Sequence, residues 1–85
     1  MDPQMEELLK SAEAISKLSP HEASILSFLK DGYSTRDIAQ ILHMSHKKVQ
    51  AYRQSILDKL SARNTAHAVA MYSRKLQLEI HLRRH

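Results

Sequence analysis

The 85-residue sequence contains no cysteine, a single glycine, two prolines and only four aromatic residues, three tyrosines and one phenylalanine. Without cysteine the chain forms neither disulfides nor thiolate zinc sites. Because strands need frequent turn residues and aromatic or β-branched pairing partners, this composition argues against a β-sandwich and favours an all-α fold. No apolar run approaches the ~18 residues that a membrane span requires, and no signal-peptide pattern opens the chain, so we expect a cytoplasmic, nucleoid-associated protein without membrane contact.

A chain of 85 residues has room for one small domain, since domains usually contain ~100–200 residues. Hydrophobic residues make up 42% and charged residues 26%, a balance typical of folded soluble proteins. A core this small and without disulfides is often stabilised by oligomerisation. We therefore expect a folded domain and consider a homodimer plausible.

The charge is divided unevenly along the chain. Residues 1–31 carry three lysines against six acidic residues, a net charge of −3, whereas residues 32–85 carry ten basic residues against three acidic ones, a net charge of +7. A concentrated basic region suggests a polyanionic partner, with nucleic acid ahead of a membrane surface. The alternative is a basic surface that only keeps the protein soluble.

The sequence gives no sign of catalysis or of metal binding. It has no glycine-rich phosphate loop, and its carboxylates are scattered over helix starts, so we expect no enzyme and no cofactor. The histidines His43 and His46 flank a helix boundary, and His81 and His85 have i, i+4 spacing. Because neither pair has an acidic or cysteine third ligand nearby, we expect no metal site.

The first helix is predicted to begin at Asp2-Pro3, because aspartate is a good N-cap and proline fits the first helical position. Apolar residues at three- and four-residue spacing then form one face of this helix. That face either packs on the domain or binds a protein partner or a second copy of the chain. Its members are Met5, Leu8, Leu9, Ala12 and Ile15.

Capping patterns predict the next two helices. Ser19 and Glu22 form a capping box for a helix that begins at Pro20 and ends before Gly32. Ser34 and Asp37 form a second, box-like start of a short helix of about ten residues. The side chains expected to face the core are Ala23, Ile25, Leu26 and Leu29 in the first of these helices and Ile38, Ala39, Ile41 and Leu42 in the second.

A further helix is predicted from an N-cap at Ser45 to about Leu60, and another begins at a cap at Asn64 or Thr65. Their inward residues are Val49, Ile56, Leu57 and Leu60 in the former and Ala68, Val69, Tyr72 and Leu76 in the latter. The helices on either side of residues 43–45 are joined by a very short turn, and the second is longer and basic. This arrangement is that of a helix-turn-helix motif.

The helix over residues 46–60 places charge where its own dipole opposes it. Lys47 and Lys48 lie in its first turn, where a cation costs ~0.3–1 kcal/mol, but where a phosphate would be bound favourably. The face opposite the apolar residues consists of Lys47, Gln50, Ala51, Gln54 and Asp58. Glutamine can pair with an adenine edge and alanine can contact a thymine methyl group, so this face is suited to a major groove.

Two side chains flank that face, and a third lies near the apolar side. Lys48 and Tyr52 are placed to contact backbone phosphates. Arg53 is expected to pack its stem along the core while its guanidinium reaches an acid or a phosphate. These placements predict a DNA-binding helix, and the alternative is a solvated basic helix in a protein-interaction module.

From Leu18 to about Lys75 the sequence resembles the LuxR-type (GerE/NarL-like) helix-turn-helix domain of bacterial transcription regulators. The matching stretches are LSPHEASILSFLKDGYS, TRDIAQILHMS, KKVQAYRQSILDKL and ARNTAHAVA, in family order and spacing. The resemblance implies a four-helix domain, here preceded by a short N-terminal amphipathic helix. It also implies that the third helix of the domain enters the major groove and that the fourth carries much of the dimer contact on two-fold related half-sites.

The resemblance also implies roles for individual residues. The base-reading positions of the family fall on Gln50, Ala51 and Gln54, its phosphate-contacting positions on Thr35, Lys47, Lys48, Tyr52 and Lys59, and the dimer stripe on Ala66, Val69 and Ser73. This sequence has Lys48 where the family usually has threonine and Asp37 where it has glutamate. Gln50 and Ala51 stand where lysine or asparagine is usual, so the preferred DNA sequence is not transferable.

We therefore expect three segments: an N-terminal helix or linker over residues 1–17, the helix-turn-helix domain over 18–76 and a basic tail over 77–85. A short last helix would bury little area in a dimer, which would then be weak without DNA. The predicted function is sequence-specific binding of double-stranded DNA by a bacterial transcription regulator, either free-standing or excised from a longer chain. The alternative is an adaptor that binds another regulator without specific DNA binding of its own.

Overall fold

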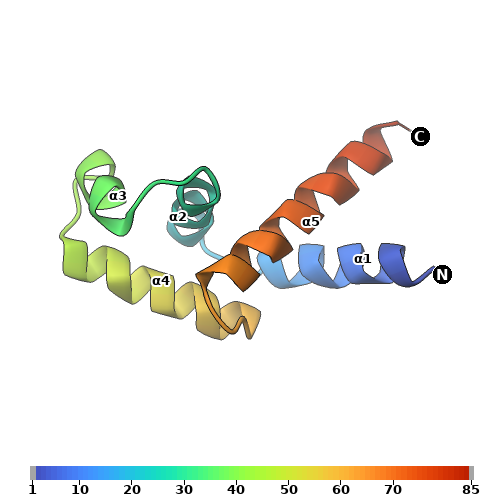
Figure 1. The fold of residues 1–85 in the computed structure, drawn as a ribbon, viewed down its shortest axis with the longest axis horizontal. Coiled ribbons are helices and arrows are strands. Elements are labelled where there is room, and N and C mark those ends of the chain that lie inside the picture. Colours follow the sequence, from blue (N-terminus) through green and yellow to red (C-terminus); the bar gives the residue numbers. More distant parts are fainter. Residues whose placement is uncertain (1, 85) are drawn as a thin grey trace.

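The computed structural model describes residues 2–84, and within that range it contains helices and turns but no strand. The elements are α1 (Pro3–Ile15), α2 (Pro20–Lys30), α3 (Thr35–Ile41), α4 (His46–Leu60) and α5 (Thr65–Arg83). Figure 1 shows α2, α3 and α4 gathered at one end, while α1 and the far part of α5 extend towards the other. The molecule is elongated, with extents of 43 × 24 × 19 Å. The all-α prediction is confirmed.

The helix starts follow the capping patterns of the sequence. Ser19 and Glu22 form a complete capping box at α2, and Ser34 and Asp37 form one at α3. Ser45 caps α4, and Asn64, rather than Thr65, caps α5. Because a capping side chain satisfies amide groups within its own first turn, short stretches of sequence were sufficient to place these starts.

The core lies among α2, α3, α4 and the first half of α5, and the end of α1 contributes Ile15. Its buried members are Ile15, Ile25, Leu26, Ile38, Ala39, Val49, Ile56, Leu60, Ala68 and Met71. One predicted core residue is wrong, since Ile41 is 44% exposed. At 100° per residue Ile41 lies about 160° around α3 from Ala39, outside the sector that α3 turns towards the rest of the domain.

The last helix is much longer than expected. α5 contains 19 residues and continues through residue 76 to Arg83, so the predictions of a short last helix and of a separate tail from residue 77 are wrong over this range. No glycine or proline interrupts the sequence there, and Leu78 is buried at 6% exposure. His85, half of the histidine pair noted above, lies outside the described residues.

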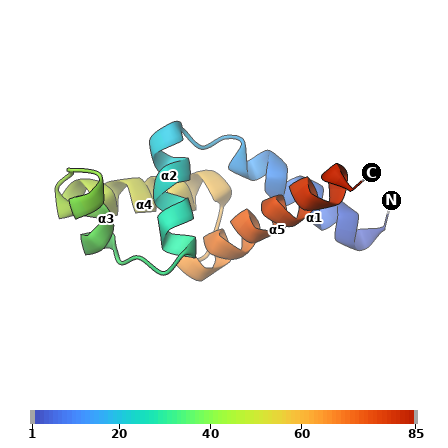
Figure 2. The same ribbon diagram turned by 90° about the horizontal axis from the view of Figure 1, so that it is seen from above.

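α1 packs along α5, and Figures 1 and 2 show the two helices side by side beyond the helix-turn-helix. Leu8 and Ile15 are buried as predicted, but Leu9 is 39% exposed and Ser11 is buried at 3% in its place. The buried sector is centred near Ser11 and Ile15, and Leu9 lies about 100° from Leu8 around the helix. The apolar face of α1 is therefore used mostly within the chain.

We predict that Ser61→Gly stabilises the domain. Ser61 ends α4 with φ 52° and ψ 36°, the left-handed conformation, which costs a non-glycine residue more than glycine. The free energy of unfolding should rise by about 0.5–1 kcal/mol in urea titrations. The matched control is Ser16→Gly, because Ser16 ends α1 with φ −62° and should gain nothing. Equal effects of the two changes would contradict the conformational argument.

Candidate nucleic-acid interface

The turn between α3 and α4 is built without glycine. His43 takes φ 55°, and the Met44 N–H donates to the Ala39 carbonyl at 2.9 Å, closing the end of α3. The side chain of Met44 packs on the core, and Ser45 then begins α4. These contacts fix the angle at which α4 leaves α3.

The two faces of α4 differ as the sequence predicts. Val49, Ile56 and Leu60 are buried, whereas the opposite side carries the exposed residues Lys47, Lys48, Ala51, Gln54 and Asp58, with Gln50 half-buried at its edge. Within residues 2–84, neither Lys47 nor Lys48 takes part in an ion pair. Gln54 Nε2 donates to Asp58 Oδ1 at 3.0 Å. The outer face of α4 therefore presents two free ammonium groups at its N-terminal end.

A buried carboxylate ties α2 to α4. Glu22 is 2% exposed and accepts hydrogen bonds from Lys59 Nζ at 2.7 Å, Ser55 Oγ at 2.5 Å and the Ser19 N–H at 2.9 Å. Burial raises the pKa of Glu22, but these hydrogen bonds together outweigh it and lower the pKa to about 2. The ionised carboxylate thus holds the middle of α4 against the start of α2.

Three of the predicted phosphate-contacting residues share one cleft between α2 and α4. The cleft has a volume of about 440 Å³ and is lined by Ser19, Glu22, Lys48, Ala51, Tyr52, Ser55 and Lys59. The Tyr52 ring stacks on His21 of α2, with centroids 5.9 Å apart. Because Glu22 already binds Lys59, Lys48 supplies the uncompensated positive charge of the cleft.

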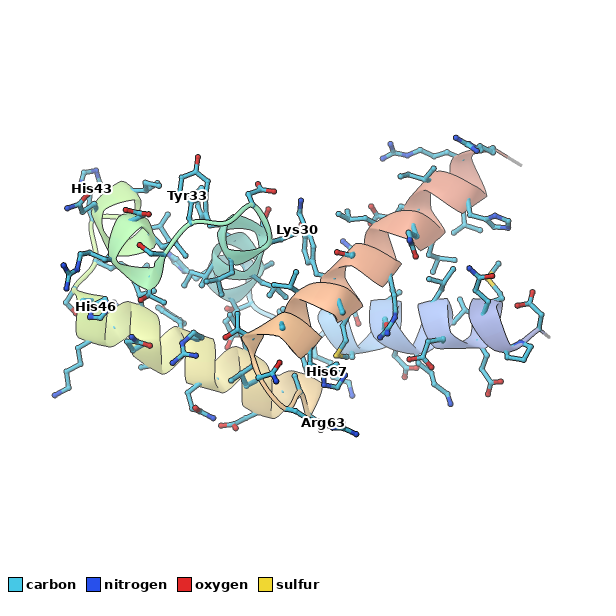
Figure 3. The ribbon with its side chains drawn as sticks, viewed as in Figure 1. Lys30, Tyr33, His43, His46, Arg63 and His67 are labelled. Atoms are coloured by element: carbon cyan, nitrogen blue, oxygen red, sulfur yellow. The ribbon has the colours of Figure 1, made fainter. Side chains whose placement is uncertain are left out.

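The other two predicted phosphate-contacting residues lie elsewhere. Thr35 begins α3, and its Oγ1 lies 3.0 Å from His46 Nε2 and 3.5 Å from Gln50 Nε2. Figure 3 shows His46 where α4 begins, with α3 directly above it. Lys47 is exposed in the same turn of α4. The structure therefore gathers Lys48, Tyr52 and Lys59 on one flank of the outer face, and Thr35 at its N-terminal end.

Arg53 is placed differently from the prediction. Its guanidinium, expected to reach an acid or a phosphate, donates from Nε to Gln50 Oε1 at 3.0 Å and from its terminal nitrogen to Thr65 Oγ1 at 3.2 Å. The side chain is half-buried between α4 and the start of α5. A predicted base-reading residue, Gln50, is thus bonded within the chain at both ends of its amide group.

Comparison with known proteins identifies the family to which these helices belong. The family described as "Bacterial regulatory proteins, luxR family" matches residues 16–72, which include α2, α3 and α4 and the first part of α5. The chain belongs to the LuxR family. The match covers the helix-turn-helix and leaves all of α1 and the end of α5 outside it.

Several curated relatives of this LuxR-family domain are named as regulators. The oxygen regulatory protein NreC of Staphylococcus epidermidis is 33% identical over 76 residues, 89% of this chain and 35% of the relative. The virulence-factor transcription regulator BvgA of Bordetella pertussis is 35% identical over 60 residues, 71% of this chain and 29% of the relative. The chain thus spans about a third of the length of these relatives. No solved structure gives a significant match.

Of the predicted dimer residues of the LuxR-family domain, Ala66 and Ser73 lie on α5 outside the core cluster, whereas Val69 packs partly against that core. Ala66 is exposed and Val69 and Ser73 are half-buried, while Ala68 and Met71 face inward. The same three- and four-residue spacing continues to Leu76 and to Ile80, which is 51% exposed. The stripe is longer than the sequence suggested, because α5 is longer.

Sequence reasoning missed the tertiary roles of Glu22, Ser55 and His46 in this LuxR-family domain. Glu22 was assigned only to a cap, yet its other contacts come from residues 33 and 37 positions away. His46 was considered only in connection with metal binding, which the sequence did not favour, whereas its Nε2 lies 3.0 Å from Thr35 Oγ1 of α3. Contacts between residues so far apart in the sequence cannot be predicted from local spacing.

Among residues 2–84, no helix is both long and apolar enough to cross a bilayer.

Proposed function

We propose that this LuxR-family domain binds double-stranded DNA in a sequence-specific manner as part of a transcription regulator, with α4 in the major groove. The outer face of α4 carries the proposal, since it combines two free lysines at the helix N-terminus with amide side chains and no large apolar group. The names of the relatives support it: BvgA is described as a transcription regulator and EvgA of Escherichia coli as a DNA-binding transcriptional activator.

The electrostatics of α4 favour an anion at its start. The positive end of the helix dipole already attracts phosphate, and Lys47 and Lys48 add two charges that the fold itself does not use. Without an anion these lysines destabilise the helix by ~0.3–1 kcal/mol each, so their position is explained by a ligand rather than by stability. A DNA backbone is the extended polyanion that such a surface fits.

The roles proposed along the interface follow from position. Base edges would be contacted by Ala51 and Gln54 on the outer face and by Gln50 at its edge. Phosphates would be contacted by Thr35, Lys47, Lys48, Tyr52 and Lys59, which lie at its end and along its flank. Asp58 lies towards the C-terminal end of α4, where it accepts a hydrogen bond from Gln54.

The proposed active species is a two-fold symmetric dimer formed through α5. Ala66, Val69 and Ser73 lie on one side of this helix at the spacing that pairs two helices in a symmetric contact. α1 also packs on α5, where Glu7 pairs with Arg74, a residue about 100° around the helix from Ser73. Two copies of α4 would then read two related half-sites, one helical turn of DNA or a multiple of it apart.

The experiment that tests the proposal is selection from randomised duplex DNA at two salt concentrations, followed by sequencing. Enrichment of a two-fold symmetric motif, with an affinity that falls steeply as salt rises, would establish a sequence-specific dimeric DNA-binding protein. Salt-sensitive binding without enrichment would contradict specificity. A lack of binding even at low salt would contradict DNA binding and leave the adaptor reading, in which the domain acts on another regulator.

Lys47→Ala is expected to weaken binding to every DNA sequence by about the same factor. Lys47 is exposed in the first turn of α4 and would neutralise one phosphate. Removing that contact should reduce the slope of log affinity against log salt by about one unit without changing the preferred motif. Lys10→Ala is the matched control, since Lys10 is an exposed lysine on α1, a helix that is not part of the proposed interface. A changed motif in Lys47→Ala would assign this lysine to base reading instead.

A further inference from the structure

The amide group of Gln50 is held at both ends by neighbouring side chains. Its oxygen accepts from Arg53 Nε at 3.0 Å, and its nitrogen lies 3.5 Å from Thr35 Oγ1 and 3.4 Å from His46 Nε2. The network continues from Arg53 to Thr65 at the start of α5. Three helices therefore fix the orientation of one side chain on the outer face of α4.

The network leaves Gln50 with the groups that a base contact needs. A glutamine amide offers two N–H donors and two acceptor lone pairs. The hydrogen bond from Arg53 occupies one lone pair, and one N–H can serve Thr35 and His46 together. One donor and one acceptor remain, and this pair is what a bidentate contact with the N7 and N6 amino group of adenine requires.

All of these contacts can be hydrogen bonds at once only when His46 Nε2 is an acceptor. The nitrogen of Gln50 can only donate, and the hydroxyl of Thr35 can accept from it while donating its own proton to His46 Nε2. His46 Nε2 must then be an acceptor, which places the ring proton on Nδ1. A second proton on Nε2 would turn this acceptor into a donor that faces the N–H groups of Gln50.

Rotation of the Gln50 amide would not resolve that conflict. Turning the amide by 180° would bring its oxygen towards a protonated His46, but would place its N–H groups against Arg53 Nε, which is also a donor. Either orientation then leaves two donors facing each other. Protonation of His46 therefore removes one of the contacts that hold the amide, while the hydrogen bond from Arg53 remains.

We propose that His46 is a positioning residue for base reading by Gln50, and that its protonation reduces the base discrimination at that position. The inference rests on the proposed function, because it concerns the specificity of the same interface. His46 itself need not touch DNA. It acts by keeping the amide of Gln50 in the one orientation whose free donor and acceptor match a base edge.

The charged groups around His46 do not compensate for an added proton. α3 contributes Arg36 and Asp37, and the Asp37 carboxylate is already bonded to the Ser34 N–H of its own cap. α4 contributes Lys47 and Arg53, and the turn contributes His43. Among residues 2–84 no ion pair involves His46. The added charge raises affinity for all DNA alike, so discrimination between sequences, rather than affinity, is the quantity to measure.

The test compares two duplexes with the full-length chain at pH 8 and pH 5.5, at constant ionic strength. One duplex is the motif obtained by selection, and the other differs at the base pair whose preference Gln50→Ala relaxes. A bidentate contact predicts an affinity ratio between about 5 and 150 at pH 8. We expect the ratio to be smaller at pH 5.5 than at pH 8.

Three variants separate positioning from a structural effect, with folding checked for each by circular dichroism. His46→Gln restores an acceptor that does not titrate, so its ratio should be retained at both pH values. His46→Ala should have a low ratio at both. His43→Asn is the matched control, because Figure 3 places His43 on the outer side of α3, away from His46, and asparagine tolerates its positive φ. It should behave as the unmodified chain.

The outcomes distinguish a failure of the inference about His46 from a failure of the proposed function. A ratio that is relaxed by Gln50→Ala but is equal at both pH values would overturn the inference and leave the proposed function intact. A ratio that still falls with pH in His46→Gln would assign the effect to another group, such as His21 beside Tyr52, and would also overturn it. If selection enriches no motif, the proposed function fails and the inference fails with it.

Discussion

Glu22→Ala is expected to lower the free energy of unfolding by about 3 kcal/mol at pH 7, because it removes a buried carboxylate that three groups bind. The change leaves the half-buried Ser55 hydroxyl without its acceptor. It also removes the hydrogen bond from the Ser19 N–H that forms one half of the capping box of α2. Lys59 loses less, because its side chain is 42% exposed and its ammonium can return to water. Urea unfolding followed by circular dichroism measures the difference.

The lowered pKa of Glu22 also predicts how the stability of the domain depends on pH. The pKa of Glu22 is lowered from 4.5 to about 2 in the fold, so the unfolded chain binds its proton first as pH falls. The stabilisation is therefore complete above about pH 5 and is lost as pH falls from 4.5 through 2. A shift of this size corresponds to about 3 kcal/mol.

Glu22→Gln provides the control for charge. It keeps the size of the side chain but does not titrate, so its stability should not show the additional loss between pH 4.5 and 2. Glu6→Ala provides the control for position, because Glu6 makes only an exposed ion pair with Lys10 at 3.6 Å and should cost less than about 0.5 kcal/mol. Similar effects of Glu6→Ala and Glu22→Ala would contradict the role assigned to the buried network.

The parts of the fold that the sequence predicted are those fixed by near neighbours. Ser19 with Glu22, Ser34 with Asp37, and Ser45 each satisfy amide groups within one turn, so three helix starts could be read directly. Leu9 and Ser11 show the limit of prediction from near neighbours. Which of them is buried depends on the angle at which α5 crosses α1, and no local pattern encodes that angle.

In the candidate interface, too, some features were predictable from the local sequence and others were not. The two faces of α4 follow from its helical period, so the exposed positions of Lys47, Ala51 and Gln54 were predictable. The bonds that hold Gln50 were not, because Thr35 and His46 come from different sides of the turn and Arg53 also reaches the start of α5. What a residue exposes can be read from periodicity, whereas what orients it depends on tertiary packing.

The length of α5 leads to the second large expected effect. Ile80→Asp should weaken binding to a two-fold symmetric site by about 100-fold, by preventing two copies from pairing. Ile80 is 51% exposed and lies two helical turns beyond Ser73, on the stripe proposed for the dimer. Two charged side chains facing each other across a symmetric contact would repel, because each copy places the same residue near the axis. Titration of full and half sites measures the loss.

Leu82→Asp is the matched control, because it makes the same change at another exposed apolar residue of the same helix. Leu82 is 61% exposed, and at 100° per residue it lies about 200° around α5 from Ile80. Its substitution should leave binding to both sites unchanged. Ile80→Asp should likewise leave the affinity for a single half-site unchanged, since α4 lies apart from this end of α5, as Figure 1 shows. A loss of half-site affinity, or an equal effect of Leu82→Asp, would contradict pairing through this stripe, because pairing requires one face of α5 and adds affinity only where two half-sites are bound together.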